Sequence, residues 1–444
     1  MQPAETTAQG SPRLAVDPFQ PLLRVLHRYR QDVHQLHEPS GPDGLALAVA
    51  AAGGPLPPTL VAFLERWNGA ALFRGALRIR AAAELAPASL SVPAVVIFAD
   101  GPLPAEHWAF SLDAQGGAAF GRWTAADAAT GALDSFTPLH ERFDRWLAAT
   151  IRILDENLRD PAACLAVRLD ADPASGYLLL QDARRHREGG DLRRAKTLLE
   201  RATASTPELI PAWACLGEVH QELGDVRSAR FAWLHALRAL RLPAPWPSDD
   251  AVGPELITRL AAIMPVGDAG WERELMRFLE DGAKDAADAR EAEIAAAAAH
   301  ALAQIRLGRG DRRAAVAGLE AFVTRASAFR HPPLAVELTL LLARILVDLG
   351  RHDEAERRLR RLRGAAWPAE PRAQIVLGSI AVQRQEPWAE MMLKDAIEDL
   401  SSVRRVGPRG ALDLELAEAH VLVAERHRMQ DRAEPAEASL AAAE

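Results

Sequence analysis

Apolar residues recur at helical spacing near the start of the chain and predict two helices. The first covers residues 18–37, where apolar side chains fall on one face, and the breaker cluster Glu38-Pro39-Ser40-Gly41-Pro42 ends it. The second follows Leu56-Pro57-Pro58, because proline suits a first helical turn, and Asn68-Gly69 ends it. Residues 1–17 show no periodicity, so a flexible leader is the simplest interpretation.

A strand-rich stretch follows. Residues 94–99 predict a buried strand, and residues 107–113 alternate between apolar and polar. Residues 118–124 can pair with the second strand through a turn at Gln115-Gly116-Gly117. From Pro138 the helical spacing returns. Residues 18–160 are therefore predicted to form an α+β domain with a small, mostly antiparallel sheet and helices.

After Pro161 the chain consists of helical segments separated by similar turns. These turns are Gly190-Asp191, Gly224-Asp225, Gly310-Asp311 and Gly350-Arg351. The first two lie 34 residues apart, a period typical of a solenoid built from helix pairs. A helix pair cannot bury its apolar face alone, so the pairs are expected to stack.

One of these units carries a recognisable residue pattern. Small residues stand where two helices approach closely and large residues where they interlock: Trp213, Leu216-Gly217, Leu223-Gly224, Ala229, Trp233 and Ala236. The pattern resembles the tetratricopeptide (TPR) repeat, and the units around Ala183, Ala303 and Leu342 repeat its offsets. Weaker units follow near residues 377–396 and from residue 416. The resemblance implies an all-α TPR-like solenoid over residues 161–444, with an irregular segment at 242–295.

The predicted α+β domain carries a second pattern. In order, it contains Leu56-Pro57-Pro58, Trp67-Asn68-Gly69, Val96-Ile97-Phe98-Ala99, the strand from Trp108, and an amphipathic helix from Phe143. This order resembles the SUKH superfamily of Smi/Knr-type domains. Many of its members are bacterial immunity proteins, so the resemblance implies a domain that binds a protein partner, with a toxin or effector as the candidate.

Composition narrows the classes of partner. The 444 residues are 49% hydrophobic and 25% charged, which suits two or three globular domains. The formal net charge of -8 gives no overall attraction to nucleic acid or to anionic lipid, and no apolar run is long enough to span a membrane. With only Cys164 and Cys215, we expect no disulfide framework and a cytoplasmic location.

Motifs for catalysis or for a cofactor are missing from the sequence. It has no phosphate-binding loop, dinucleotide fingerprint, nucleophile elbow or zinc-binding helix motif. Asp170-Ala171-Asp172 opens like a calcium loop but lacks the later ligands, and Cys164 and Cys215 lie in apolar, helical surroundings. We therefore expect a non-catalytic protein with no cofactor and no metal.

The TPR resemblance also implies where partners bind. The first helix of each pair lines the concave face, so its residues outside the packing positions are the expected contacts. By register these are Tyr177, Arg184 and Arg187 in the first unit, Glu218, Gln221 and Glu222 in the second, His300 and Gln304 in the third, and Glu337, Arg344 and Asp348 in the fourth. The mixed charges favour a peptide or helix of alternating charge as the ligand.

Three functions stay open at this point. In the first, the SUKH-like domain binds one protein and the TPR groove recruits a second. In the second, the chain is a structural TPR scaffold and its N-terminal domain is a cap. In the third, the N-terminal domain holds an unrecognised enzyme site, which a deep pocket around Asp113 and His107 would favour.

Overall fold

The chain folds into two compact units, residues Met1–Ser248 and Asp249–Glu444. The computed structural model describes residues 17–29, 32–88, 95–101, 106–112, 118–124, 135–240, 252–265, 267–282, 289–325, 332–362, 369–404 and 413–443. The expected leader up to residue 16, the turn at 115–117 and Asp113 lie outside the described residues. Contacts divide the chain within the predicted irregular segment and not at residue 160.

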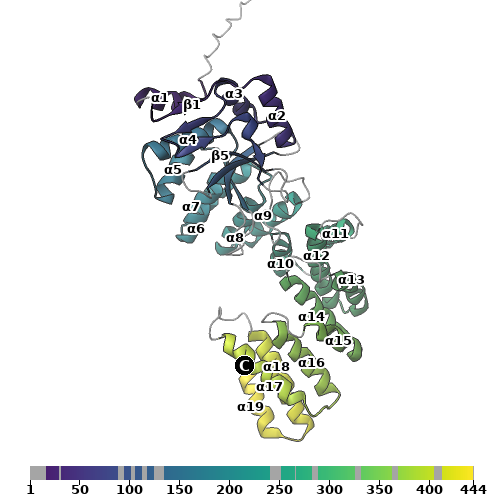
Figure 1. Ribbon diagram of the computed structural model, residues 1–444. Helices are drawn as coiled ribbons and strands as arrows, with labels where there is room; N and C mark the ends of the chain where they lie inside the picture. The colour runs from purple at the N-terminus through teal and green to yellow at the C-terminus, as the bar shows by residue number, and fades with distance from the viewer. Residues whose placement is uncertain are drawn as a thin grey trace, which may run out of the picture. The chain divides into compact units, whose positions relative to one another are not determined.

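The first unit begins with an antiparallel sheet and its helices (Figure 1). The described strands run in the order β1-β2-β3-β5-β6-β7-β8, with β4 beside β5. They are β1 (Gln35–Leu36), β2 (Ala70–Leu72), β3 (Leu77–Ile79), β4 (Ala86–Pro87), β5 (Val95–Asp100), β6 (His107–Leu112), β7 (Ala118–Thr124) and β8 (Ser135–His140). The helices are α1 (Gln20–Arg28), α2 (Pro42–Ala52), α3 (Pro58–Arg66), α4 (Phe143–Asp155) and α5 (Pro161–Ala171).

The three predicted strands and the proline-started helix α3 are confirmed, whereas two predicted boundaries are wrong. The first helix ends at Arg28, because Gln35 and Leu36 pair with β2 instead of continuing the helix. Pro138 belongs to β8, at the edge of the described sheet, where a proline costs no ladder hydrogen bond. The predicted breaker cluster in fact starts α2, with Pro42 in its first turn.

Both faces of the sheet are buried. On one face, Phe98, Phe110 and Phe120 pack with α4, and the rings of Phe98 and Trp146 have centroids 4.6 Å apart. The other face contributes Val95, Ala109, Ala119, Trp123 and Phe136 to a core that it shares with repeat helices. Figure 1 shows these repeat helices on the side of the sheet away from α2 and α3. This shared core explains why the contacts do not divide the chain at residue 160.

The first two helix pairs are α6 (Gly176–Glu188) with α7 (Leu192–Ser205), and α8 (Ile210–Glu222) with α9 (Val226–Ala239). The predicted turns are confirmed: Gly190 and Gly224 both have φ of +79°, a conformation that favours glycine. The side chains of Asp191 and Asp225 then accept backbone N–H groups of the next helix at 3.2 and 3.0 Å. Each Gly-Asp pair therefore ends one helix and caps the next.

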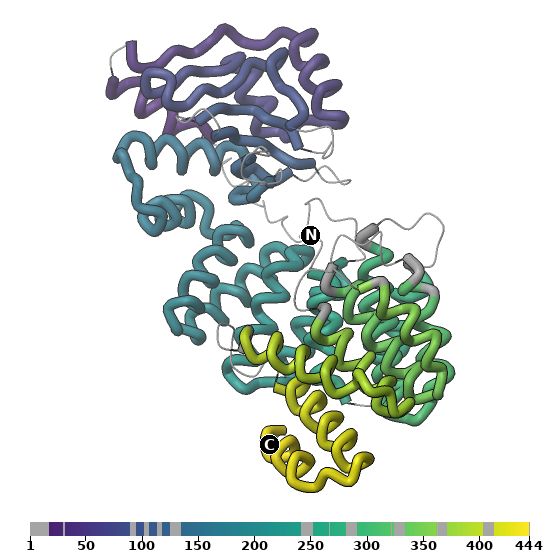
Figure 2. The backbone as a smooth tube through the Cα atoms, turned by 60° about the horizontal axis from the view of Figure 1, so that its bottom comes forward, coloured from purple at the N-terminus to yellow at the C-terminus, as the bar shows by residue number. Residues whose placement is uncertain are grey.

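The described elements of the second unit are helical. They are α10 (Val252–Ile263), α11 (Ala269–Gly282), α12 (Ala289–Gly308), α13 (Arg312–Arg325), α14 (Pro332–Asp348), α15 (His352–Leu359), α16 (Ala369–Gln383), α17 (Ala389–Arg404), α18 (Asp413–Met429) and α19 (Ala433–Ala443). Consecutive helices from α12 to α19 pack as pairs, and the first helices of these pairs lie side by side in the order α12, α14, α16, α18. Figure 2 shows this stack, which confirms the predicted all-α solenoid.

Candidate partner-binding face

In the first unit, an ionic cluster on α6 and α8 brings three predicted contact residues together. Arg187 of α6 forms an ion pair with Glu218 of α8, and its Nε donates to Glu222 at 2.8 Å. Partial burial acts to lower the pKa of Arg187, but the hydrogen bond to Glu222 and the charge of Glu218 outweigh it and raise the pKa. Two further predicted residues, Arg184 and Gln221, are exposed on the same helices.

Tyr177 does not belong to this face. Its side chain is only 3% exposed and lies in the core that α6 shares with the sheet, together with Leu179 and Leu180. The prediction treated α6 as a helix with one free face, but β8 and its neighbours cover this end of the helix. Tyr177 is therefore a packing residue, and its place among the groove contacts was wrong.

In the second unit, Arg372 of α16 joins three neighbouring first helices. It forms an ion pair with Glu337 of α14, and its Nε lies 3.1 Å from Oε1 of Glu415 on α18. The Arg372 side chain is 18% exposed. Burial alone would lower its pKa, but the two glutamates outweigh burial and raise it. The charge is thus held on the face that the first helices share.

A second ion pair crosses the same face. Nη2 of Arg344 on α14 lies 2.5 Å from Oε2 of Glu418 on α18, so the pair passes over the intervening α16. His300 of α12 is half-buried; burial lowers its pKa, the charge of Glu337 opposes this, and that of Arg372 adds to it. The charged groups of three repeats therefore influence one another across this face.

The remaining predicted residues lie away from these clusters. Gln304 is exposed on α12. Asp348 is exposed near the end of α14, with its Oδ2 3.5 Å from Nε of Arg312 on α13. The structure therefore joins Glu337 and Arg344 to a network that includes α18, and it leaves Gln304 and Asp348 outside that network.

Sequence reasoning missed Arg372, Glu415 and Glu418, because the last two repeats were assigned no contacts. A signal was present in the register. Arg372 follows Glu337 by 35 residues, about one repeat, and it takes the equivalent position on the next first helix. Adding one repeat length to the contact positions of the fourth unit would therefore have predicted Arg372.

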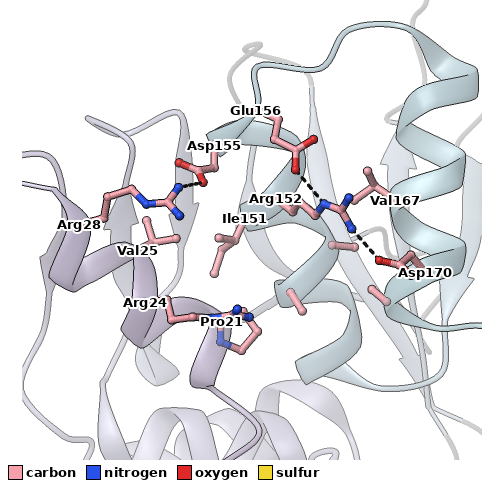
Figure 3. A pocket seen from close by; sticks show the side chains of 13 residues that line it. Pro21, Arg24, Val25, Arg28, Ile151, Arg152, Asp155, Glu156, Val167 and Asp170 are labelled. Atoms are coloured by element: carbon pink, nitrogen blue, oxygen red, sulfur yellow. Dashed lines mark hydrogen bonds and ion pairs between the residues drawn. The ribbon is translucent and has the colours of Figure 1, made fainter.

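A cavity of about 330 Å³ in the first unit is lined by α1, α4 and α5 (Figure 3). Two of the three arginines that line it are paired with carboxylates of the cavity: Arg28 lies 2.5 Å from Asp155, and Arg152 lies 2.8 Å from Glu156 and 2.6 Å from Asp170. Asp170, which opens the calcium-like sequence, is thus engaged by an arginine. These pairs stabilise the packing of α1 and α5 on α4 and leave little net charge for a ligand.

Asp100, the last residue of β5, has partners of its own. Asp100 accepts hydrogen bonds from Arg80 at 2.7 and 3.1 Å, and its Oδ1 lies 2.8 Å from Nδ1 of His107. Burial would raise the pKa of Asp100, but these two partners lower it. Asp100 therefore serves as an acceptor that holds β3 and β6, through Arg80 and His107, to the end of β5.

A comparison with known families agrees with the helix pairs. The tetratricopeptide repeat family model matches residues 300–356 and 340–387, which include the last part of α12 and the whole of α13, α14, α15 and α16. The second unit contains tetratricopeptide repeats. The match does not extend to the N-terminal domain, whose resemblance to SUKH domains stays a prediction. No curated protein sequence matches this chain.

Several solved structures align with the chain at low identity. A tetratricopeptide repeat protein from Parabacteroides merdae is 14% identical, with a TM-score of 0.38, over 64% of this chain and 97% of that one. The apo form of RapI is 11% identical, with a TM-score of 0.43, over 68% and 79%. Pseudomonas aeruginosa PilF is 15% identical, with a TM-score of 0.34, over 58% and 96%.

None of the described helices has the length and apolar character that crossing a membrane requires. Within the described parts of the chain, no three His, Cys, Asp or Glu side chains are grouped so that they could hold a metal ion.

Proposed function

We propose that this chain is a non-catalytic scaffold whose repeat helices bind a peptide or a protein. The observation that carries the proposal is the row of charged side chains on neighbouring first helices, Glu337 of α14, Arg372 of α16 and Glu415 of α18. Solenoids commonly bind their partners along such extended faces. The tetratricopeptide repeats of the second unit support the same conclusion.

The charges define the chemistry of the expected partner. Both signs alternate along the face, so a strongly acidic or strongly basic segment would meet like charge at every second position. A segment with alternating charges can instead exchange its own groups for the present ion pairs. We therefore propose an extended peptide or a helix of alternating charge as the ligand, bound in the cytoplasm.

For the N-terminal domain, we propose the role of a cap on the first repeat. One face of its sheet, including Trp123 and Phe136, is buried against α6 and the helices that follow it. The SUKH resemblance implies a toxin or effector as partner, and such a partner would have to bind elsewhere on the domain. The shared core favours the cap, because a terminal repeat needs its apolar face covered.

The test is affinity capture with the full-length chain from a lysate of its native source, followed by quantitative mass spectrometry. Three exposed residues on first helices are changed: Arg184→Glu with Gln221→Arg in one variant, and Gln304→Arg in another. The matched control is Arg357→Glu, an exposed position on the second helix α15. We expect a face variant to lose at least one partner that the wild type and the control retain.

Retention of every partner by both face variants would contradict binding along the first helices. The two-module function expects a second partner that both face variants retain, because that partner would bind the N-terminal domain. The experiment distinguishes binding along the first helices from binding through the N-terminal domain, because the face variants change no residue of the sheet or its loops.

A further inference from the structure

A second cavity in the first unit lies between the sheet and three helices. It has a volume of about 540 Å³ and is lined from strands β3, β6 and β7 and from helices α4, α5 and α6. This volume is within the range of small-molecule sites in proteins. All of its lining residues are described and belong to one compact unit.

One part of the lining is apolar. Leu77 of β3, Trp108 of β6, Ile153 and Leu154 of α4, and Leu165 of α5 all contribute to it. The Trp108 indole is only 5% exposed, so the ring is fixed in the core and presents a rigid surface. Such a wall favours the apolar or aromatic body of a ligand.

The other part is strongly basic. Four arginines line the cavity, Arg122, Arg159, Arg168 and Arg185, against one carboxylate, Glu106. Arg185 lies 3.6 Å from Asp182 on its own helix. For the other three, no carboxylate of the described residues lies within ion-pair distance. The cavity therefore holds an excess of positive charge.

Arg168 is the decisive residue of this group. It is half-buried on α5, and its guanidinium carbon lies 5.7 Å from the centroid of the Trp108 ring. Burial lowers its pKa, and the neighbouring charge of Arg122 adds to that effect, while Glu106 opposes it. A charge that is withdrawn from water without a carboxylate partner is costly, and a bound anion would offset that cost.

The cavity of Figure 3 shows that this excess is not general to the unit. There, Arg28 and Arg152 each meet a carboxylate within 3 Å. Both cavities use α4 and α5, yet only the larger one leaves most of its arginines unmatched among the described residues. The difference therefore points to a ligand that supplies the missing negative charge.

We propose that the larger cavity binds a small organic anion, a carboxylate or a phosphomonoester with an apolar or aromatic body. The anionic head is held by Arg168 and Arg122, and the body packs against Trp108 and Leu154. Guanidinium groups suit both heads, since their paired N–H donors match carboxylate and phosphate oxygens.

The test is isothermal titration of the full-length protein with phenylacetate, phenyl phosphate, phenylacetamide and inorganic phosphate. We expect one of the two organic anions to bind saturably at one site. Phenylacetamide lacks the anionic head and inorganic phosphate lacks the aromatic body. Each should therefore bind at least about tenfold more weakly. Which anion binds more tightly distinguishes a carboxylate ligand from a phosphate ligand.

Variants assign the site. Arg168→Gln should weaken binding at least about tenfold, whereas Arg193→Gln, an exposed arginine on α7, should leave the Kd unchanged. Arg168→Lys keeps the charge but loses the paired donors, so its affinity for the anion should lie between those of the wild type and Arg168→Gln. If neither organic anion binds, or if Arg168→Gln binds as well as the wild type, the proposal is wrong.

Thermal unfolding without ligand gives an independent readout. Removing this unmatched, half-buried charge with Arg168→Met should leave the midpoint of unfolding unchanged or raise it. Removing an arginine that stabilises the fold would instead lower the midpoint. A lowered midpoint with unchanged anion affinity would overturn the proposal.

Discussion

In the first unit α6 packs against the face of a β-sheet, whereas the described repeat helices of the second unit pack only on other helices. The first arrangement gives a broad core that runs from Val95 and Trp123 of the sheet to Val219 of α8. In the second unit, described buried residues of α16 to α18 cluster with one another, some around Leu400 and others around Leu393, without any strand. The sheet therefore helps to hold the helix pairs of the first unit, whereas contacts between helices hold the described helix pairs of the second unit.

The difference shows that the first repeat of a solenoid needs a cover for its apolar face, whereas later repeats are covered by their neighbours. Repeat units contact only their neighbours, so their stability is close to a sum of local terms. In the second unit, half-exposed ion pairs such as Arg344 with Glu418 supply part of this stability, and each adds little to the free energy of unfolding. We expect local opening to cost less free energy there than in the first unit.

The largest expected effect comes from cutting the shared core. A chain ending at residue 160 would expose the sheet face of Trp123 and Phe136, so it should aggregate, whereas a chain ending at residue 248 should be monomeric and unfold cooperatively. Size-exclusion chromatography and circular dichroism on both chains check this. A monomeric, cooperatively folded 1–160 chain would show that the sheet does not depend on the repeats.

A single truncation of the same core should also be severe. Trp123→Ala removes a side chain that is 2% exposed, and we expect a loss of ~3–5 kcal/mol in the free energy of unfolding of the first unit. Denaturant unfolding of the 1–248 chain measures it. The exposed Phe231→Ala is the control and should change the free energy by less than ~0.5 kcal/mol.

A matched pair of glycines compares the units directly. A Cβ at Gly217 would lie 2.2 Å from Nε1 of Trp233, an indole fixed by its hydrogen bond to the Ala214 carbonyl at 3.0 Å. At Gly378 the nearest atom is the flexible end of Leu393, 2.5 Å away. Gly217→Ala should therefore cost ~1–3 kcal/mol and Gly378→Ala less, as thermal unfolding of the full chain would show. The reverse order would mean that the helix pairs of the second unit are the less adjustable ones.

Acid should weaken the first unit through His140, which is buried beside the first repeat. Burial lowers the pKa of His140, although Asp172, 3.1 Å from its Nδ1, opposes the shift. Because the folded pKa lies below the unfolded value of about 6.5, the unfolded chain binds more protons as the pH falls, and stability declines below about pH 6.5. His140→Gln should reduce this decline between pH 7.5 and 5.5, whereas the exposed His27→Gln should not.

The smallest effect is expected from an ion pair on the face of the second unit. Arg344→Gln should change stability by no more than ~1 kcal/mol, because both side chains of the pair with Glu418 are more than a third exposed. A chemical denaturation curve in low and in high salt checks this, and a larger loss would show that the pair holds α18 in place.

The helix pairs could be predicted because their signals are local. A glycine with positive φ and an aspartate that caps the next helix are adjacent in sequence, so no distant contact is needed to recognise them. Strands β5 to β7 were also predictable, since the apolar run of β5, the alternation along β6 and the glycine-rich turn before β7 are local signals. The two-residue strand β1 was not, because only its pairing with β2 defines it.

The candidate sites could be predicted only in part, for the same reason. The register found Glu337 and Arg344, but the burial of Tyr177 depends on a sheet that lies in another region of the sequence. The unmatched state of Arg168 depends on strands and helices that meet in space. Neither property is encoded within a single repeat.

The Gly-Asp turns of the repeats have a consequence for how such a chain can change in length. Each turn contains its own stop and start signal, and α6 is fixed on the sheet, so inserting or deleting one whole helix pair beyond α9 would leave the anchored end intact. The reach of the scaffold can therefore vary in steps of one repeat while its attachment to the N-terminal domain stays the same. Because one end of the array is packed on the sheet, whole repeats can be gained or lost only away from that end.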